Sequence, residues 1–141
     1  DKSLDLSLKI NVVKIKPGNW IIYRKGKNKK KLLISTGSTA KDCIKILSKD
    51  KKIEFNWYSI PIWGMKVKKN QLKKFLKFSE IISVENHFQD GGFGSWINEI
   101  ISSKQHKQKI DVLNKYIKKE VVGMVGSEKY LNNKFGPSRN N

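Results

Sequence analysis

The chain has 141 residues, of which 30 are Lys or Arg and 12 are Asp or Glu, so its formal net charge is +18. That length suits one domain, and no apolar run approaches the ~20 residues that a membrane-spanning helix needs. Cys43 is the single cysteine, which excludes an internal disulfide framework and suits a reducing compartment. The first residues lack the basic and then apolar pattern of a secretory signal. We therefore expect a soluble, cytoplasmic protein that does not contact a membrane.

The positive charge is almost entirely lysine. Arg24 and Arg139 are the only arginines, whereas base-edge readers and phosphate clamps favour arginine for its planar fork. The lysines are spread along the chain and are densest at 27–31. This pattern favours a solvated lysine-rich surface over a nucleic-acid site. A stand-alone lysine-rich module that binds nucleic acid or another polyanion is the alternative function.

The amino-terminal part predicts an arm followed by a sheet edge. Residues 1–14 predict a linker or arm, and residues 15–141 predict the folded domain. β-Branched residues at 10–15 and apolar residues at 20–23 flank the sequence Pro-Gly-Asn at 17–19, which is a strong turn signal. We predict that the two flanking segments form an antiparallel pair at one edge of the sheet.

A strand, a helix and a second strand are predicted next. The apolar run at 31–36 predicts a buried strand, and Ser38 or Thr39 would cap the helix after it. An apolar stripe at helical spacing follows, made by Cys43, Ile44 and Leu47. Cys43 is therefore predicted to be a small core residue rather than a reactive thiol. Apolar residues at positions 53, 55 and 57 then predict a strand over 53–60.

The remaining segments continue the alternation of strands and helices. In order, we predict a loop at 62–69, a helix at 71–78 capped by Asn70, a strand at 81–84, a glycine-rich loop at 91–95, a helix from 96 to about 103, a helix at 105–119, a strand at 120–126, a helical turn at 127–131 and a frayed tail at 132–141. The helix at 105–119 is predicted from Ile110, Leu113 and Ile117, which recur at helical spacing.

This order of elements predicts an α/β fold class. Strands alternate with helices from residue 31 onward, behind an amino-terminal hairpin. We therefore predict a three-layer α/β/α domain whose central sheet has about five strands, is mostly parallel, and has one antiparallel edge strand. The sequence shows no internal repeat and no low-complexity segment.

The stretch 81–95 holds most of the residues that could carry chemistry: Glu85, His87, Gly91, Gly92, Gly94 and Ser95. Glu85 and His87 follow a predicted strand and would make an acid/base pair if they faced a cleft. The commoner role of such a pair is a hydrogen-bonded loop anchor. The glycines could bring backbone amides to an anion at a helix N-terminus, or they could allow the helix to pack closely on the sheet. We favour the structural role for both groups.

Other active-site patterns are absent from the sequence. The glycine loop lacks the third glycine of a dinucleotide fingerprint, and the chain has no Gly-Lys-Ser/Thr phosphate loop. The second histidine, His106, lies in a Lys- and Gln-rich stretch, so no metal-ligand cluster is grouped together. We predict no catalytic residue, no cofactor-binding residue and no metal site in this chain.

Several stretches together resemble one enzyme family. Residues 81–95 read Ile-Ile-Ser-Val-Glu-Asn-His-Phe-Gln-Asp-Gly-Gly-Phe-Gly-Ser. They resemble the Val-Glu-x-His and Gly-Gly-x-Gly-Ser signature of the carboxy-terminal domain of transketolase-type thiamine diphosphate enzymes. The stretches 17–26, 32–38 and 122–138 are similar to the entry segment, the first parallel strand and the closing strand and tail of that domain. The resemblance spans roughly 15–138.

The resemblance implies a supporting domain of a larger enzyme in carbohydrate metabolism. In that family, thiamine diphosphate and Mg²⁺ are held by the preceding pyrimidine- and diphosphate-binding domains, which belong to the same chain or to a partner subunit. The full enzyme is a homodimer that transfers ketol units between sugar phosphates. The branch stays open between transketolase or its split-subunit form, deoxyxylulose-phosphate synthases and the beta subunit of 2-oxoacid dehydrogenases. The motif loop is then expected to be structural or to lie at an interface.

Overall fold

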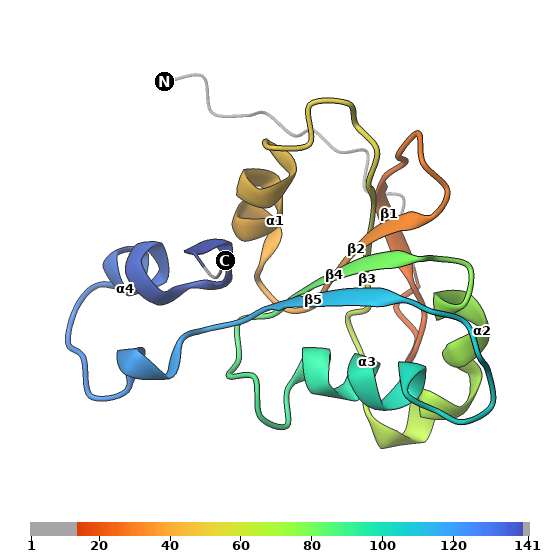
Figure 1. The fold of residues 1–141 in the computed structure, drawn as a ribbon. Helices are drawn as coiled ribbons and strands as arrows, with labels where there is room; N and C mark the ends of the chain where they lie inside the picture. Colours follow the sequence, from red (N-terminus) through yellow and green to blue (C-terminus); the bar gives the residue numbers. More distant parts are fainter. Residues whose placement is uncertain (1–13, 140–141) are drawn as a thin grey trace.

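The computed structural model describes residues 14–139 and contains a five-stranded sheet between helices (Figure 1). The elements are β1 Ile21–Arg24, β2 Lys31–Ser35, α1 Ala40–Leu47, β3 Asn56–Ser59, a 3-10 helix Met65–Asn70, α2 Leu72–Phe75, β4 Glu80–Val84, α3 Phe93–Ile101, β5 Asp111–Lys115, a 3-10 helix Lys119–Val121, α4 Glu128–Phe135 and a 3-10 helix Pro137–Arg139. The predicted arm at 1–14 lies, except for Lys14, outside the described residues.

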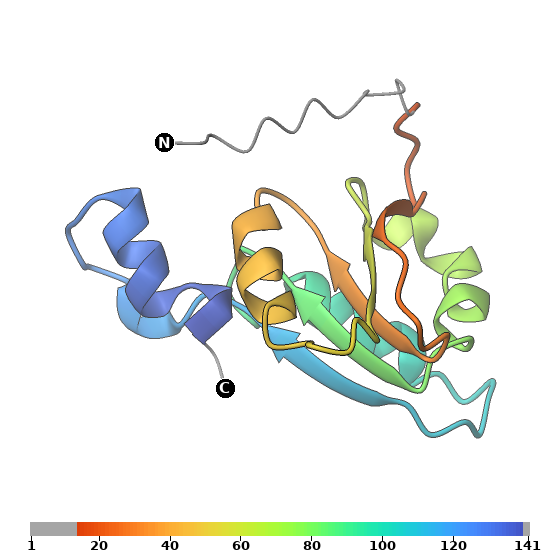
Figure 2. The same ribbon diagram turned by 90° about the horizontal axis from the view of Figure 1, so that it is seen from above.

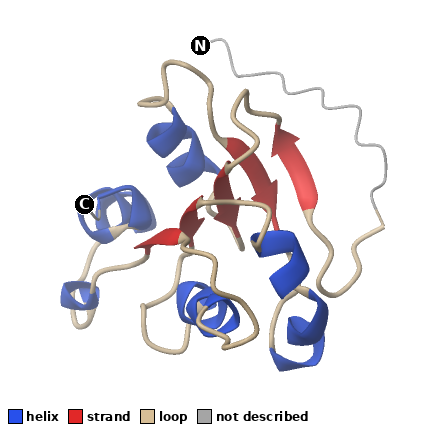
Figure 3. Ribbon diagram, turned by 45° about the vertical axis from the view of Figure 1, so that its right-hand side comes forward, coloured by secondary structure: helices blue, strands red, loops and turns tan. Residues whose placement is uncertain are grey.

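The sheet has the strand order β1-β3-β2-β4-β5. β1 pairs with β3 in antiparallel fashion, and the three other pairings are parallel. Helix α1 covers one face of the sheet, while α2 and α3 cover the other (Figure 1, Figure 3). The predicted class, a three-layer domain with a mostly parallel sheet and one antiparallel edge strand, is confirmed.

Side chains on the two faces of the sheet pack into two separate hydrophobic cores. Leu32 and Ile34 point to the side of α2 and α3, whereas Leu33 points to α1, because successive side chains of a strand face opposite ways. The larger core comprises Leu32, Ile34, Ile60, Phe75, Phe78, Ile81, Phe93, Trp96, Ile97 and Ile100. The smaller core comprises Leu33, Cys43, Leu47, Trp57 and Val84. Each fully buried Leu or Ile contributes about 1.5–3 kcal/mol to folding.

The partner of the edge strand differs from the predicted hairpin. β1 pairs with β3, with Ile21 opposite Ser59. Of the predicted strand at 10–15, residues 10–13 lie outside the described part and residues 14–15 form no strand. The predicted turn does form, with Gly18 at a φ of 77° and Asn19 N–H donating to Lys16 O at 3.1 Å.

The predicted helix at 105–119 is wrong. This segment contains β5, which runs parallel to β4 with Val112 opposite Ile81. The buried strand β4 needs a hydrogen-bonding partner on each side, and β5 supplies the outer one. Helical spacing of Ile110, Leu113 and Ile117 therefore did not decide the structure, and Leu113 is 48% exposed.

The predicted final strand at 120–126 is also wrong. A 3-10 helix and a turn replace it, with Gly123 at a φ of 82° and Val125 97% exposed. The tail is not frayed within the described residues. α4 extends to Phe135, and the following 3-10 helix buries Pro137 against the body of the domain.

Several element boundaries also differ from the predictions. β3 is shorter than the predicted strand at 53–60, because Ile53 has a φ of 55° and is 45% exposed. Thr39 precedes α1, but its hydroxyl donates to Thr36 O instead of capping the helix, and Ile44 is exposed rather than part of the apolar stripe. α2 is a single turn that begins after Gln71 instead of Asn70. Within residues 14–139, no helix has the length and apolar character needed to cross a membrane.

We predict that the Cys43 thiol does not react in the native protein. The side chain is fully buried, and burial raises its pKa to about 12, so almost no thiolate forms near neutral pH. Labelling with Ellman's reagent at ~pH 8 should be at least about 100-fold slower in buffer than in denaturant. Equally fast labelling in both conditions would contradict the placement of Cys43 in the smaller core.

Candidate functional site

The candidate site lies at the carboxyl edge of the sheet, between β2 and β4. Since α1 and α3 cover opposite faces, the β2–α1 and β4–α3 loops leave the sheet in opposite directions (Figure 2). Open α/β sheets bind ligands in the crevice that such a divergence creates. The motif loop at 85–95 forms one side of this edge.

Glu85 directly follows β4 as the first residue of the motif loop and is fully buried. Its Oε1 accepts a hydrogen bond from Phe93 N–H at 2.9 Å, and its Oε2 accepts one from Gly94 N–H at 2.6 Å. These amides belong to the first turn of α3, where backbone N–H groups have no intrahelical acceptor and a negative charge is stabilised. Glu85 therefore ties the end of β4 to the start of α3.

The glycines make room for this carboxylate. A Cβ on Gly92 would lie 1.9 Å from Glu85 Oε1 and 2.6 Å from Phe88 O. A Cβ on Gly94 would lie 2.8 Å from Asn114 Cγ, so this glycine also allows α3 to approach β5. Gly91 has a φ of 70° and no atom close to a Cβ, so it is required for the turn and not for space.

Glu85 and His87 do not act as an exposed acid/base pair. Burial raises the pKa of Glu85, and the hydrogen bonds from Gly94 and Phe93 oppose that shift. Both carboxylate oxygens are used by the α3 amides, whereas His87 is exposed. Glu85 is therefore a hydrogen-bonded anchor of the loop, as the structural alternative predicted.

The other residues of the motif hold the loop in place. Ser95 Oγ donates a hydrogen bond to Gln89 O, which closes the loop onto the first turn of α3. The carbonyl of His87 accepts from Ile117 N–H at 2.9 Å, so the loop is joined to the segment after β5. Whether this loop also contacts another domain stays a prediction.

The N-terminus of α3 is not a phosphate site. The amides that would bind an anion are already bound by Glu85, and its carboxylate occupies the space that Gly92 leaves. Within residues 14–139, no group of three or more His, Cys, Asp or Glu side chains could hold a metal ion. His106 lies away from the loop, with Nε2 at 2.5 Å from Ile101 O.

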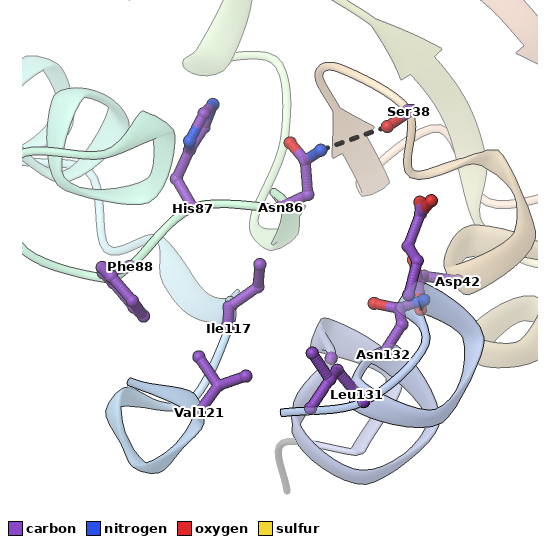
Figure 4. Close-up of a pocket in the computed structure, with 12 residues that line it drawn as sticks. Ser38, Asp42, Asn86, His87, Phe88, Ile117, Val121, Leu131 and Asn132 are labelled. Carbon is purple, nitrogen blue, oxygen red and sulfur yellow. Dashed lines mark hydrogen bonds between the residues drawn. The ribbon is translucent and has the colours of Figure 1, made fainter. Parts of the chain in front are cut away.

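A cavity of about 560 Å³ opens beside the motif loop (Figure 4). It is lined by Ser38, Asp42, Asn86, His87, Phe88, Ile117, Val121, Gly126, Glu128, Leu131, Asn132 and Gly136. These residues come from the β2–α1 loop and α1, the β4–α3 loop, the segment after β5, and the region of α4. We name this space the edge cavity.

Two contacts fix the walls of the edge cavity. Asn86 Nδ2 donates to Ser38 Oγ at 3.1 Å (Figure 4). This hydrogen bond joins the β4–α3 loop to the β2–α1 loop at the topological switch point, where the two loops leave toward opposite faces of the sheet. Where α1 and α4 border the cavity, Asn132 Nδ2 of α4 lies 3.5 Å from Asp42 Oδ1 of α1.

Helix α4 is itself held in place at both ends. Ser127 caps it by accepting from Tyr130 N–H at 3.2 Å. At its other end, Phe135 O accepts from Lys118 N–H at 2.9 Å, and Phe135 is buried. The helix therefore forms a fixed wall of the edge cavity.

Sequence reasoning found the motif loop and missed most of the edge cavity. Of its lining residues, His87 was selected in advance as a site residue. Asn86 carried a usable signal, since it directly follows Glu85 at the carboxyl end of a predicted strand. Asp42 and Asn132 carried none, because they are 90 positions apart and meet only in the folded chain.

Comparisons with known proteins agree with the fold. No protein-family model and no curated protein matches the sequence. Among solved structures, one described as "Split gene transketolase, inactive beta4 tetramer" superposes with a TM-score of 0.69 at 19% sequence identity. The match covers 91% of this chain and 41% of that chain. The chain therefore has the α/β fold of a transketolase-type domain and spans less than half of that neighbour's length.

We predict that Gly92→Ala destabilises the protein by about 1–3 kcal/mol, because the new methyl group would clash with Glu85 Oε1 and Phe88 O. Gly91→Asn is the matched control. It adds a larger side chain at the neighbouring position, where there is open space and where Asn tolerates a positive φ. Denaturant unfolding measures both variants. Equal stabilities of the two variants would contradict the proposed fit of the carboxylate.

We predict that Glu85→Gln costs about 1–3 kcal/mol, because the NH2 group of the amide cannot accept a hydrogen bond and would face one of the two α3 N–H groups, whereas both oxygens of the carboxyl group keep acceptor capacity, also in the protonated form. The difference should depend on pH. Burial raises the pKa of Glu85 in the folded protein above its value in the unfolded chain, about 4.3. The contribution of this shift to the free energy of unfolding is complete below the unfolded-state pKa and is lost as the pH rises through the folded-state pKa. The difference in the free energy of unfolding between wild type and Glu85→Gln should therefore shrink from ~pH 4 to ~pH 7. Parallel stability curves for the two proteins would refute this.

Proposed function

We propose that this chain is the non-catalytic carboxy-terminal domain of a transketolase-type, thiamine diphosphate-dependent enzyme, and that it supports assembly with the domains that hold the cofactor. The observation that carries the proposal is the fold match, which covers 91% of this chain but 41% of the neighbour. The matched neighbour is described as a split gene transketolase in an inactive tetramer. By analogy, this chain acts together with the complementary part of such an enzyme.

The residues described here do not fit thiamine diphosphate and Mg²⁺. A diphosphate needs free amides or cationic side chains, but Glu85 occupies the amides at the start of α3. In the part of the chain that the structure describes, no Lys or Arg lines the edge cavity. We therefore assign the cofactor to the missing domains, which would transfer ketol units between sugar phosphates in a homodimeric, cytoplasmic enzyme. We assign no step of that reaction to residues of this chain.

An exposed apolar segment supports a role in assembly. After β5, Val122 is 70% exposed, Val125 is 97% exposed and Tyr130 is 50% exposed. Exposed apolar side chains that lie so close together in the sequence favour a site that another protein surface covers. We propose that the segment 122–130 contacts the complementary domains, which are encoded on the same gene or on a partner gene.

We predict that the isolated chain gives no heat when thiamine diphosphate and Mg²⁺ are titrated into it. A chain with pyrimidine- and diphosphate-binding domains, identified from the coding sequence immediately upstream, should bind this domain and the cofactor. Isothermal titration calorimetry measures both interactions. A micromolar Kd of the isolated chain for thiamine diphosphate would contradict the proposal, and so would failure of the two proteins to associate.

We predict that Val125→Asp weakens this association by at least about tenfold, because it places a charge in an apolar contact. Met65→Asp is the matched control, since Met65 is 77% exposed and lies in the 3-10 helix next to α2. Sedimentation of the mixed proteins measures the complex. Equal association of both variants would exclude the segment 122–130 from the interface.

A further inference from the structure

We propose that the edge cavity binds a small, uncharged molecule that is rich in hydroxyl groups and has one apolar face, such as a free sugar or a nucleoside without phosphate. The inference stands on the geometry of the cavity and does not depend on the proposed role in assembly. The cavity lies at the switch between β2 and β4, where open α/β sheets bind ligands. Its volume of about 560 Å³ is within the range of pockets for small molecules.

The charge of the lining excludes an anionic ligand. The chain has 30 Lys and Arg residues, yet none of those within residues 14–139 lines the edge cavity. Asp42 and Glu128 place two carboxylates in its wall. A phosphate would meet these carboxylates without a cationic side chain to offset the repulsion, whereas a hydroxyl group can donate hydrogen bonds to them.

The polar groups suit a ligand with several hydroxyl groups. Asp42 is 3% exposed, and its one described contact to Asn132 is at the outer limit of a hydrogen bond, so the carboxylate keeps acceptor capacity. Asn86 uses one amide N–H for Ser38, and an amide has a second N–H and a carbonyl oxygen. A lining that offers both acceptors and donors matches vicinal hydroxyl groups, which both donate and accept.

Part of the lining of the edge cavity is apolar. It is supplied by Ile117, Val121 and Leu131, which lie below Asn86 and Ser38 in the view of Figure 4. The side chains of His87 and Phe88 diverge, and Phe88 is 39% exposed at the rim (Figure 4). This apolar surface suits the face of a sugar ring or of a nucleobase, which would remove it from water.

The test uses four probes: D-ribose, adenosine, ribose 5-phosphate and adenosine monophosphate. Each is titrated into the full chain at physiological salt while the amide signals of the protein are recorded by NMR. We expect adenosine to bind with a Kd on the order of 0.1 mM and ribose more weakly. Each phosphorylated probe should bind at least about tenfold more weakly than its neutral counterpart. Binding of ribose but not adenosine would identify a free sugar as the ligand class, and binding of adenosine but not ribose would identify a nucleoside.

Two variants localise the binding. Val121→Trp fills the cavity and should weaken the neutral probe at least about tenfold, whereas Val122→Trp, at the adjacent exposed position, should not. Asp42→Asn keeps the side-chain shape and should also weaken binding, which provides a test if Val121→Trp alters the fold. The proposal is overturned if neither neutral probe binds, if the phosphorylated probes bind as tightly, or if Val121→Trp and Asp42→Asn both bind like wild type.

Discussion

The buried carboxylate of Glu85 is the interaction on which the carboxyl edge of this domain depends. It accepts hydrogen bonds from two amides of the first turn of α3, at 2.9 and 2.6 Å. A buried charge is costly unless it is paired or hydrogen-bonded, and the helix N-terminus supplies both N–H donors and a positive dipole end. Glycine is needed at position 92 because any side chain there would occupy the space of the carboxylate. One contact thus explains the acid and the glycines of the motif together.

The same contact separates this edge into an occupied part and an open part. The α3 N-terminus, which resembles an anion site in sequence, is filled by the protein's own carboxylate. The open part is the edge cavity, between the loop that Glu85 anchors and α4. Its polar groups form two pairs across separate elements, Asn86 with Ser38 and Asn132 with Asp42, and neither pair joins neighbours in the sequence. This open part is where we propose that a small neutral molecule binds.

The sequence predicted the interior of the sheet well because burial there is uniform. β2 and β4 are almost continuous apolar runs, so their existence and their parallel packing followed from local pattern. β5 was missed because Leu113 is exposed and Asp111 lies at its start, so its identity as a strand comes from pairing with β4. The role of Glu85 as a loop anchor was among the predicted alternatives. The edge cavity was not predictable, since α4 reaches α1 only through tertiary contacts of the carboxy-terminal segment.

The central claim is that Glu85, and not a ligand, binds the amides at the start of α3. A ¹³C NMR titration of the Glu85 carboxyl carbon, with the amide protons of Phe93 and Gly94 followed in the same samples, tests it most directly. We expect a pKa of Glu85 above the ordinary glutamate value, and amide shifts of Phe93 and Gly94 that change with the same midpoint. Inorganic phosphate should leave these amide signals unchanged. An ordinary pKa without linked amide shifts, or amides that respond to phosphate, would contradict the account.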